Sequence, residues 1–312
     1  MQGEVVVLIG GSGGIGRASA IRFAARGAHV VLVARGRSGL EAVAEEIARQ
    51  GGQADVMPAD MSNPEAVRQL AAEVANRHGR VDVLVYGAAV FYLAPAEGLQ
   101  LDRTRQAMDI NYWGAVHAVQ AFLPLIRRGR RKSITFISSL SVPCTPAFFT
   151  AYAAPKHALH GFAQSLRQEL RPEGIAVTLV TPGPVDTQLI EGHLHQDMYR
   201  LPLGVPVLTA DQAAEGVIQA VLRRRAEWVV PRRFGLAARL SRAFPTLLDA
   251  YYRWTIPGWT QTVLRVTEPH RGRAPVGQAE DQTGSGAADP DTGAEPEPGA
   301  GPEPVRTSAP AG

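Results

Sequence analysis

The sequence predicts an α/β protein built on a doubly wound parallel sheet. Over its first 230 residues, short apolar runs of strand length alternate with longer amphipathic stretches of helical length. The apolar runs are continuous rather than alternating, which is typical of parallel strands covered on both faces. With 45% hydrophobic and 20% charged residues, a chain of 312 residues can bury one or two substantial cores. A wholly disordered, collagen-like or disulfide-built protein is therefore excluded.

Each strand is expected where a short apolar run is bounded by turn residues. The expected strands are residues 5–9, 30–33, 54–57, 83–85, 134–137, 175–180 and 228–230. Between them lie stretches whose apolar residues recur at the spacing of one helix face. The expected helices are residues 15–26, 40–50, 64–78, 103–125, 151–170 and 211–224. This alternation predicts one doubly wound domain over residues 1–231.

Two segments follow the predicted domain. Residues 232–267 combine arginines with large apolar residues and predict short amphipathic helices that dock on the domain or on a second subunit. Peripheral contact with an anionic membrane surface is the less favoured alternative. Residues 268–312 are rich in Ala, Gly, Pro and Glu, and we expect an acidic disordered tail there, because few large apolar side chains are available to offset the entropy of ordering.

Charge and histidine placement argue against two kinds of ligand. The net charge is +3, and basic runs occupy residues 127–132 and 223–225, at the ends of predicted helices, where cations suit the helix dipole. We therefore expect no nucleic-acid partner. His193 and His195 form a His-x-His pair without a third ligand in view, so no metal site is expected.

Cysteine usage and the N-terminal sequence indicate the compartment. Cys144 is the single cysteine, so the fold needs no intramolecular disulfide, and we expect this residue to serve in packing. The chain begins with a strand-like run rather than a secretory signal, and no uninterrupted apolar stretch is long enough to span a membrane. A cytoplasmic location is the resulting expectation.

A glycine-rich loop follows the first strand and opens the first helix. Residues 9–17 read IGGSGGIGR, with glycines at positions 10, 14 and 16. Glycine permits a tight turn and lets the backbone approach a phosphate, which the amides of a helix N-terminus can bind. The simpler alternative is a tight strand-to-helix turn without a ligand, but the location in the first βαβ unit favours a dinucleotide site.

The end of the second strand distinguishes the two nicotinamide coenzymes. An acidic residue there would hold the ribose hydroxyls of NAD, whereas a basic residue would accept the 2′-phosphate of NADP. This chain has Ala34 and then Arg35. The sequence therefore favours NADP(H) over NAD(H), the alternative being that Arg35 is a solvated loop residue.

A tyrosine and a lysine share one face of a predicted helix. Tyr152 and Lys156 are four residues apart, as neighbours on a helix surface are. The ammonium is expected to lower the pKa of the tyrosine from its usual value of about 10, so that it can act as an acid or base near neutral pH. Upstream, Ser139 follows a strand at its carboxyl end, where its hydroxyl can bond a carbonyl substrate.

Together these motifs resemble the short-chain dehydrogenase/reductase family, in its compact single-domain branch with a Rossmann fold, over residues 4–231. The glycine loop fits TGxxxGxG with Ile9 in the threonine place, residues 152–156 fit YxxxK, and residues 182–187 fit PGxxxT. The resemblance implies a catalytic set of Asn111, Ser139, Tyr152 and Lys156. It implies a cofactor site that comprises Gly10, Ser12, Gly14, Ile15, Gly16, Arg35, Asp60, Met61, Gly87, Ala88, Tyr152, Lys156, Pro182, Gly183, Val185 and Thr187.

The same resemblance implies a role for each catalytic residue. Tyr152 would exchange a proton with the substrate oxygen, and Ser139 would orient that oxygen. Lys156 would lower the pKa of Tyr152 and hold the nicotinamide ribose, while Asn111 would position a water in the proton relay. The cofactor would supply the hydride. A small-molecule alcohol or carbonyl substrate and a homodimer or homotetramer are also implied.

One departure from the family pattern follows the fourth strand. Where the family usually has Asn-Asn-Ala-Gly, this chain has Tyr86-Gly87-Ala88-Ala89. The small Gly87 and Ala88 still let a cofactor approach, but the asparagine side chains that brace the strand are absent.

The loops beyond the strand ends indicate the substrate class. Residues 90–93, 142–149 and 189–203 are largely apolar and favour a hydrophobic alcohol or ketone, unless their aromatic residues only pack the loops together. We therefore expect an NADP(H)-dependent oxidoreductase that interconverts an alcohol and a ketone or aldehyde. The alternative is a non-catalytic NADP(H)-binding module that regulates or binds a partner. A sugar epimerase of the extended branch would need a larger C-terminal substrate domain, which the sequence lacks.

Overall fold

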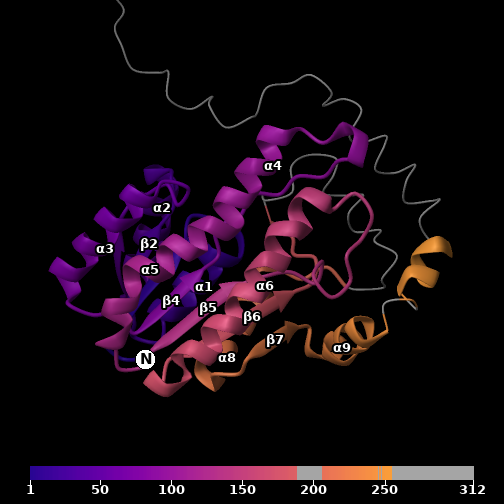
Figure 1. The fold of residues 1–312 in the computed structure, drawn as a ribbon. Helices are drawn as coiled ribbons and strands as arrows, with labels where there is room; N and C mark the ends of the chain where they lie inside the picture. The colour runs from indigo at the N-terminus through magenta and orange to yellow at the C-terminus, as the bar shows by residue number, and fades with distance from the viewer. Residues whose placement is uncertain (188–205, 245, 247, 255–312) are drawn as a thin grey trace, which may run out of the picture. The chain divides into compact units, whose positions relative to one another are not determined.

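A seven-stranded parallel sheet organises the computed structural model, which describes residues 1–187, 206–244, 246 and 248–254. Figure 1 shows the sheet with helices on both sides. The strand order is β3-β2-β1-β4-β5-β6-β7, so the winding direction reverses between β1 and β4. The strands are β1 Val5–Ile9, β2 His29–Val33, β3 Gln53–Val56, β4 Val83–Tyr86, β5 Ser133–Ile137, β6 Ala176–Pro182 and β7 Glu227–Val230. The predicted doubly wound α/β fold is confirmed.

Helices alternate with the strands along the chain. The α-helices are α1 Gly14–Ala24, α2 Arg37–Arg49, α3 Pro64–His78, α4 Leu101–Met108, α5 Gly114–Arg127, α6 Thr150–Leu170, α8 Ala210–Arg223 and α9 Gly235–Ala243. Short turns of other helical types are η1 Ala96–Gly98, η2 Asp109–Trp113, η3 Arg171–Glu173 and η4 Arg232–Phe234. Helix ends are fixed by local sequence: the Asn63 side chain accepts hydrogen bonds from Glu65 N and Ala66 N at the start of α3, and Thr209 forms a capping box with Gln212 at the start of α8.

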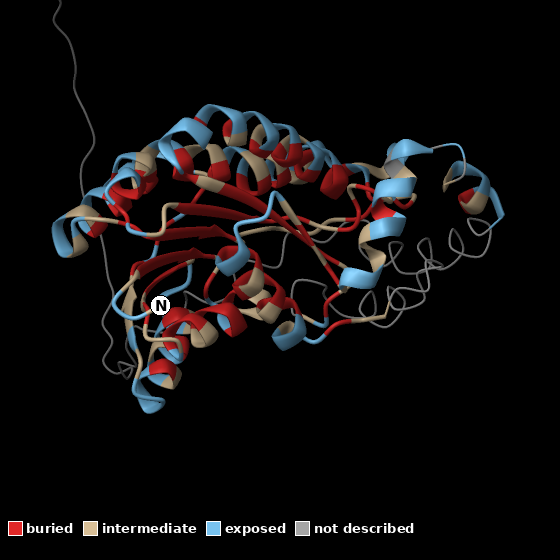
Figure 2. Ribbon diagram, turned by 90° about the horizontal axis from the view of Figure 1, so that it is seen from below, coloured by how far each residue is buried: buried red, intermediate tan, exposed pale blue. Residues whose placement is uncertain are grey.

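Two buried cores flank the sheet. On one face, α3, α5 and α6 pack on strand residues such as Val7 and Ile134. On the other, α1, α2 and α8 pack on residues such as Leu8 and Val85. Figure 2 shows the consequence, a buried sheet between helices whose outer faces are exposed. Continuous apolar strands are required because each strand contributes side chains to both cores.

The helix expected over residues 103–125 is divided, which is a departure from the sequence prediction. A π-helical turn, η2, separates α4 from α5. In this turn the Gly114 N–H bonds the Asp109 carbonyl, five residues back, instead of the Ile110 carbonyl that an α-helix would use. The apolar periodicity on either side gives no sign of this extra residue, because contacts from β4 and its loop help to fix it.

The described part of the C-terminal extension packs beside the loop that follows β5. Ser241 of α9 donates a hydrogen bond from its hydroxyl to the Pro143 carbonyl at 2.8 Å, and the Tyr252 hydroxyl donates to the Cys144 carbonyl at 3.2 Å. Leu236 and Leu240 of the same extension are exposed. Residues 255–267 and the tail predicted over 268–312 lie outside the described residues. Within the part of the chain that is described, no helix combines the length and apolarity needed to cross a bilayer.

Candidate active site

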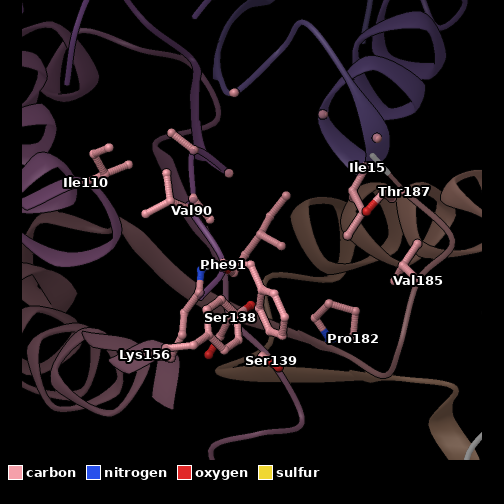
Figure 3. A pocket seen from close by; sticks show the side chains of 18 of the residues that line it. Ile15, Val90, Phe91, Ile110, Ser138, Ser139, Lys156, Pro182, Val185 and Thr187 are labelled. Carbon is pink, nitrogen blue, oxygen red and sulfur yellow. Dashed lines mark hydrogen bonds between the residues drawn. The ribbon is translucent and has the colours of Figure 1, made fainter. Parts of the chain in front are cut away.

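A cavity of about 450 Å³ lies at the carboxyl ends of the central strands. Residues that follow β1, β2, β3, β4, β5 and β6 line it, together with the first turns of α6. In Figure 3, Lys156 and Ser139 lie toward one end of the cavity and Ile15 and Thr187 toward the other. The cavity therefore joins the predicted proton-transfer residues to the predicted glycine loop.

The glycine loop leaves the start of α1 without a side-chain cap. Helix α1 follows Gly13, which offers no side-chain cap, and its first turn holds no acidic residue. Gly10 has a φ of +88°, and a Cβ there would lie 2.7 Å from the Ala88 nitrogen. A Cβ on Gly16 would lie 1.9 Å from the Gly10 carbonyl oxygen. Only glycine allows this close packing, and it leaves helix N–H groups facing the cavity, which suits the pyrophosphate of a dinucleotide.

Arg35 and Asp60, two residues of the implied cofactor site, also line the cavity. Arg35 follows β2 and is exposed there. Asp60 follows β3, and its Oδ1 accepts hydrogen bonds from the Ser62 N–H at 2.9 Å and from the Ser62 hydroxyl at 2.7 Å. These bonds fix the Asp60 carboxylate at the cavity wall. Thr187, which follows β6, packs against the glycine loop at Gly14. The contact is so close that a Cβ on Gly14 would lie 3.0 Å from the Thr187 methyl carbon.

Lys156 is buried at the other end of the cavity. Its Nζ donates a hydrogen bond to the Ile137 carbonyl at 3.0 Å and lies 5.7 Å from the centroid of the Tyr152 ring. Burial lowers the pKa of Lys156 from 10.5 to about 8, because removal from water penalises the charged form. The group still carries its proton over most of the neutral range, so it is a positive charge beside Tyr152.

The pKa of Tyr152 differs from the sequence expectation. Burial raises it from 10.0 to about 12, while a hydrogen bond with Ser139 acts in the opposite direction. The rings of Phe91 and Phe149 shield Tyr152, with centroid distances of 4.8 and 6.4 Å. Shielding from water outweighs the influence of Ser139, so Tyr152 is held in its protonated form.

Asn111 is placed differently from the other predicted catalytic residues. It is fully buried in η2, and its amide side chain bonds the backbone of Val90 twice: Oδ1 accepts from the Val90 N–H at 2.8 Å, and Nδ2 donates to the Val90 carbonyl at 2.9 Å. Every other predicted site residue lines the cavity, whereas at this turn the lining residue is Ile110. The Asn111 side chain therefore holds the loop after β4 and does not face the cavity.

Sequence reasoning missed a third polar residue on the same face of α6. His160 lies four residues beyond Lys156, and its Nε2 is 2.7 Å from the hydroxyl oxygen of Ser138, which lines the cavity beside Ser139. The spacing of Tyr152, Lys156 and His160 at intervals of four residues is a signal that could have identified it.

Cys144 also lines the cavity, with its Sγ 3.4 Å from the Ser241 hydroxyl. His193 and His195 lie outside the described residues.

Comparisons with known proteins agree with this geometry. The sequence pattern of the short chain dehydrogenase family matches residues 4–197. An 11-beta-hydroxysteroid dehydrogenase A from Sesamum indicum is 36% identical over 235 residues, which cover 72% of this chain and 67% of the relative. A fatty acyl-CoA reductase from Acinetobacter baylyi is 34% identical over 227 residues, 72% of this chain and 75% of the relative. The crystal structure of a dehydrogenase/reductase from Sinorhizobium meliloti 1021 superposes with a TM-score of 0.66 at 28% identity, covering 73% of this chain and 94% of that one.

Proposed function

The chain belongs to the short-chain dehydrogenase/reductase family, and from this membership we propose that it is an NADP(H)-dependent oxidoreductase that interconverts a hydrophobic alcohol and its ketone or aldehyde. The observation that carries the proposal is the grouping at one end of the cavity. There Tyr152 and Ser139 line the cavity together, Ser139 acts to lower the pKa of Tyr152, and the Lys156 ammonium lies 5.7 Å from the centroid of the tyrosine ring. At the other end, a bare helix N-terminus fits a dinucleotide.

The protonation states of these residues suit the reduction direction. A nicotinamide cofactor, when bound, supplies the hydride. With a pKa of about 12, Tyr152 keeps its proton at neutral pH and can donate it to an oxygen that gains negative charge. Ser139 can bond the same oxygen and orient it. Lys156 adds a positive charge beside the tyrosine, which stabilises the phenolate left after proton donation.

The preference for NADP(H) is supported by Arg35. Its exposed guanidinium borders the cavity after β2, where an NAD-dependent enzyme would carry an acidic residue. A guanidinium can make charge-assisted hydrogen bonds with a 2′-phosphate that NAD lacks. We expect Arg35→Ala to weaken NADPH binding by about 30- to 150-fold and to leave NADH binding almost unchanged.

Arg37 provides a matched control for this coenzyme test. It is an exposed arginine two residues away that pairs with Glu41 at 3.6 Å and does not border the cavity. Arg37→Ala should leave the affinity for both coenzymes unchanged in titrations followed by nicotinamide fluorescence. Equal affinity of the native protein for NADPH and NADH would overturn the assignment.

The substrate class is supported by the residues around Tyr152. Phe91 and Phe149 both border the cavity and contact each other, with ring centroids 5.6 Å apart. The relatives named above act on a hydroxysteroid and a fatty acyl-CoA, each of which has a large apolar part. A panel of steroid ketones, long-chain aldehydes and sugars, followed by loss of NADPH absorbance, tests the class. Turnover of sugars but not of the apolar compounds would contradict it.

A further inference from the structure

Two histidines and one aspartate converge on the sheet edge outside the active site. The Nε2 atoms of His29 and His78 lie 3.0 and 2.8 Å from the same oxygen of Asp55, Oδ2. The three ligand atoms all lie within 4.8 Å of one another. The residues are far apart in the sequence, so the fold alone brings them together.

The sheet register explains how this convergence arises. His29 is the first residue of β2 and pairs with Gln53 of β3, while Asp55 pairs with Val31. Because side chains alternate along a strand, His29 and Asp55 lie on the same face of the sheet. His78 is the last residue of α3, which packs on that face through Val67 and Val74. The cluster thus joins the edge strand β3 to its neighbour and to a covering helix.

The chemistry and spacing of the three groups suit a transition metal. Imidazole nitrogen and carboxylate oxygen are usual ligands of Zn²⁺, with bonds of about 2.0–2.2 Å, which places neighbouring ligand atoms about 3.3–3.6 Å apart in a tetrahedron. Small shifts of the three side chains would reach that spacing. The imidazole rings are T-shaped, 4.7 Å apart and inclined by 65°, so they do not stack and can present their Nε2 atoms to one ion from two directions.

The partial exposure of the three side chains leaves room for one more ligand from solvent. The side chains of His29, Asp55 and His78 are 29%, 24% and 11% exposed, so the cluster is partly shielded but open to solvent. The other oxygen of Asp55, Oδ1, lies 4.0 Å from the Arg77 guanidinium. Oδ2 is therefore the oxygen that faces both rings, as expected for a carboxylate that binds an ion through one oxygen.

We propose that His29, Asp55 and His78 bind one Zn²⁺ ion, with water as the fourth ligand. The ion would tie β3 and the end of α3 to β2, far along the strands from the substrate cavity, and would stabilise the fold without entering the reaction. Zn²⁺ at about a hundredfold excess over its Kd should raise the Tm by about 5 °C.

Calorimetric titration of the untagged full chain with ZnCl₂ tests the proposal. We expect one ion per chain, and binding at least tenfold weaker in His78→Gln and in Asp55→Asn. Co²⁺ should give the visible absorption of a four-coordinate ion in the native protein, and both variants should lose it. Circular dichroism checks that both variants remain folded.

Two control variants separate this cluster from other histidines. His157→Gln removes an imidazole on α6, and the double variant His193→Gln, His195→Gln removes the His-x-His pair; both should bind Zn²⁺ like the native chain. The proposal is overturned by three outcomes: absence of Zn²⁺ binding, binding that His78→Gln does not weaken, or binding that is lost with His193 and His195. The first would leave the cluster as two imidazoles hydrogen bonded to one carboxylate.

Discussion

The hydroxyl of Tyr86 donates a hydrogen bond to the backbone carbonyl of Ile110, joining the end of β4 to the π-helical turn η2. In that turn Gly114 N–H bonds Asp109 instead of Ile110, so the tyrosine hydroxyl is a new partner for the Ile110 carbonyl. The tyrosine stands where the family usually has an asparagine. In this chain the longer, fully buried side chain of Tyr86 braces the end of β4 in place of that asparagine.

Removal of this hydroxyl should destabilise the fold modestly. Tyr86→Phe loses one buried hydrogen bond, which is worth about 1 kcal/mol, and the loss should appear as a lower denaturant midpoint with an unchanged m value. Gly114 tests the packing around the hydroxyl, because a Cβ there would lie 2.2 Å from the Tyr86 oxygen and 3.0 Å from the Met61 carbonyl. Gly114→Ala should cost more than Tyr86→Phe does.

The double variant reveals whether the two residues act as a pair. Loss of the hydroxyl makes room for the new methyl group, so Tyr86→Phe with Gly114→Ala should be less destabilised than the two single losses added together. Strict additivity would show that the contact between these residues is unimportant.

Asp82 should matter for stability and not for catalysis. It is fully buried, and its carboxylate accepts hydrogen bonds from the Val5 N–H at 2.7 Å and from the Arg130 N–H at 2.5 Å, which ties the start of β1 to the segment before β5. Asp82→Ala leaves both N–H groups without this partner and should lower the free energy of unfolding by about 3 kcal/mol. Asp82→Asn, which keeps one acceptor oxygen, should lose less. An altered KM in Asp82→Asn together with an unchanged free energy of unfolding would count against this role.

Activity should fall as pH rises above about 8. The pKa of Lys156 is lowered to about 8 by burial, so its ammonium is present below this pH and lost above it. Tyr152, with its pKa raised to about 12, keeps its proton throughout the range. The rate of carbonyl reduction at saturating NADPH should therefore decline through pH 8. A flat profile up to pH 10 would contradict the role of the Lys156 charge.

The contribution of Lys156 to stability should increase with pH, in contrast to its contribution to activity. Between pH 8 and 10.5, unfolded Lys156 holds its proton while folded Lys156 releases it, so the unfolded chain binds more protons and this group's contribution to stability increases with pH. Lys156→Met removes the buried charge and should be more stable than the native chain at pH 7. That advantage should shrink as the pH rises to 10, which chemical denaturation at a series of pH values can measure.

Periodicity predicted most of the fold, because it depends on local sequence, and the family resemblance predicted most of the cavity lining. The strand at Val5–Ile9 and the helix at Pro64–His78 match the expected bounds, and the glycine loop is at the cavity as expected. The parts that were missed depend on contacts between distant residues. Val90 sets the orientation of the Asn111 side chain, and the pKa of Tyr152 reflects shielding by aromatic rings from two separate loops.

The cluster of His29, Asp55 and His78 illustrates the same limit. No spacing motif connects these residues, and only the register of β2 with β3 and the length of α3 place them together. Conversely, His160 could have been found, since it continues the four-residue spacing of Tyr152 and Lys156 on one helix.

The turnover of Tyr152→Phe shows whether the Tyr152 hydroxyl donates the proton. This variant removes only the hydroxyl that meets Ser139 and keeps the ring that packs on Phe91. Fold and NADPH affinity should persist, while NADPH-dependent reduction of the best apolar substrate should fall by about 10²- to 10⁴-fold. Turnover close to that of the native protein would show that Tyr152 is not the proton donor.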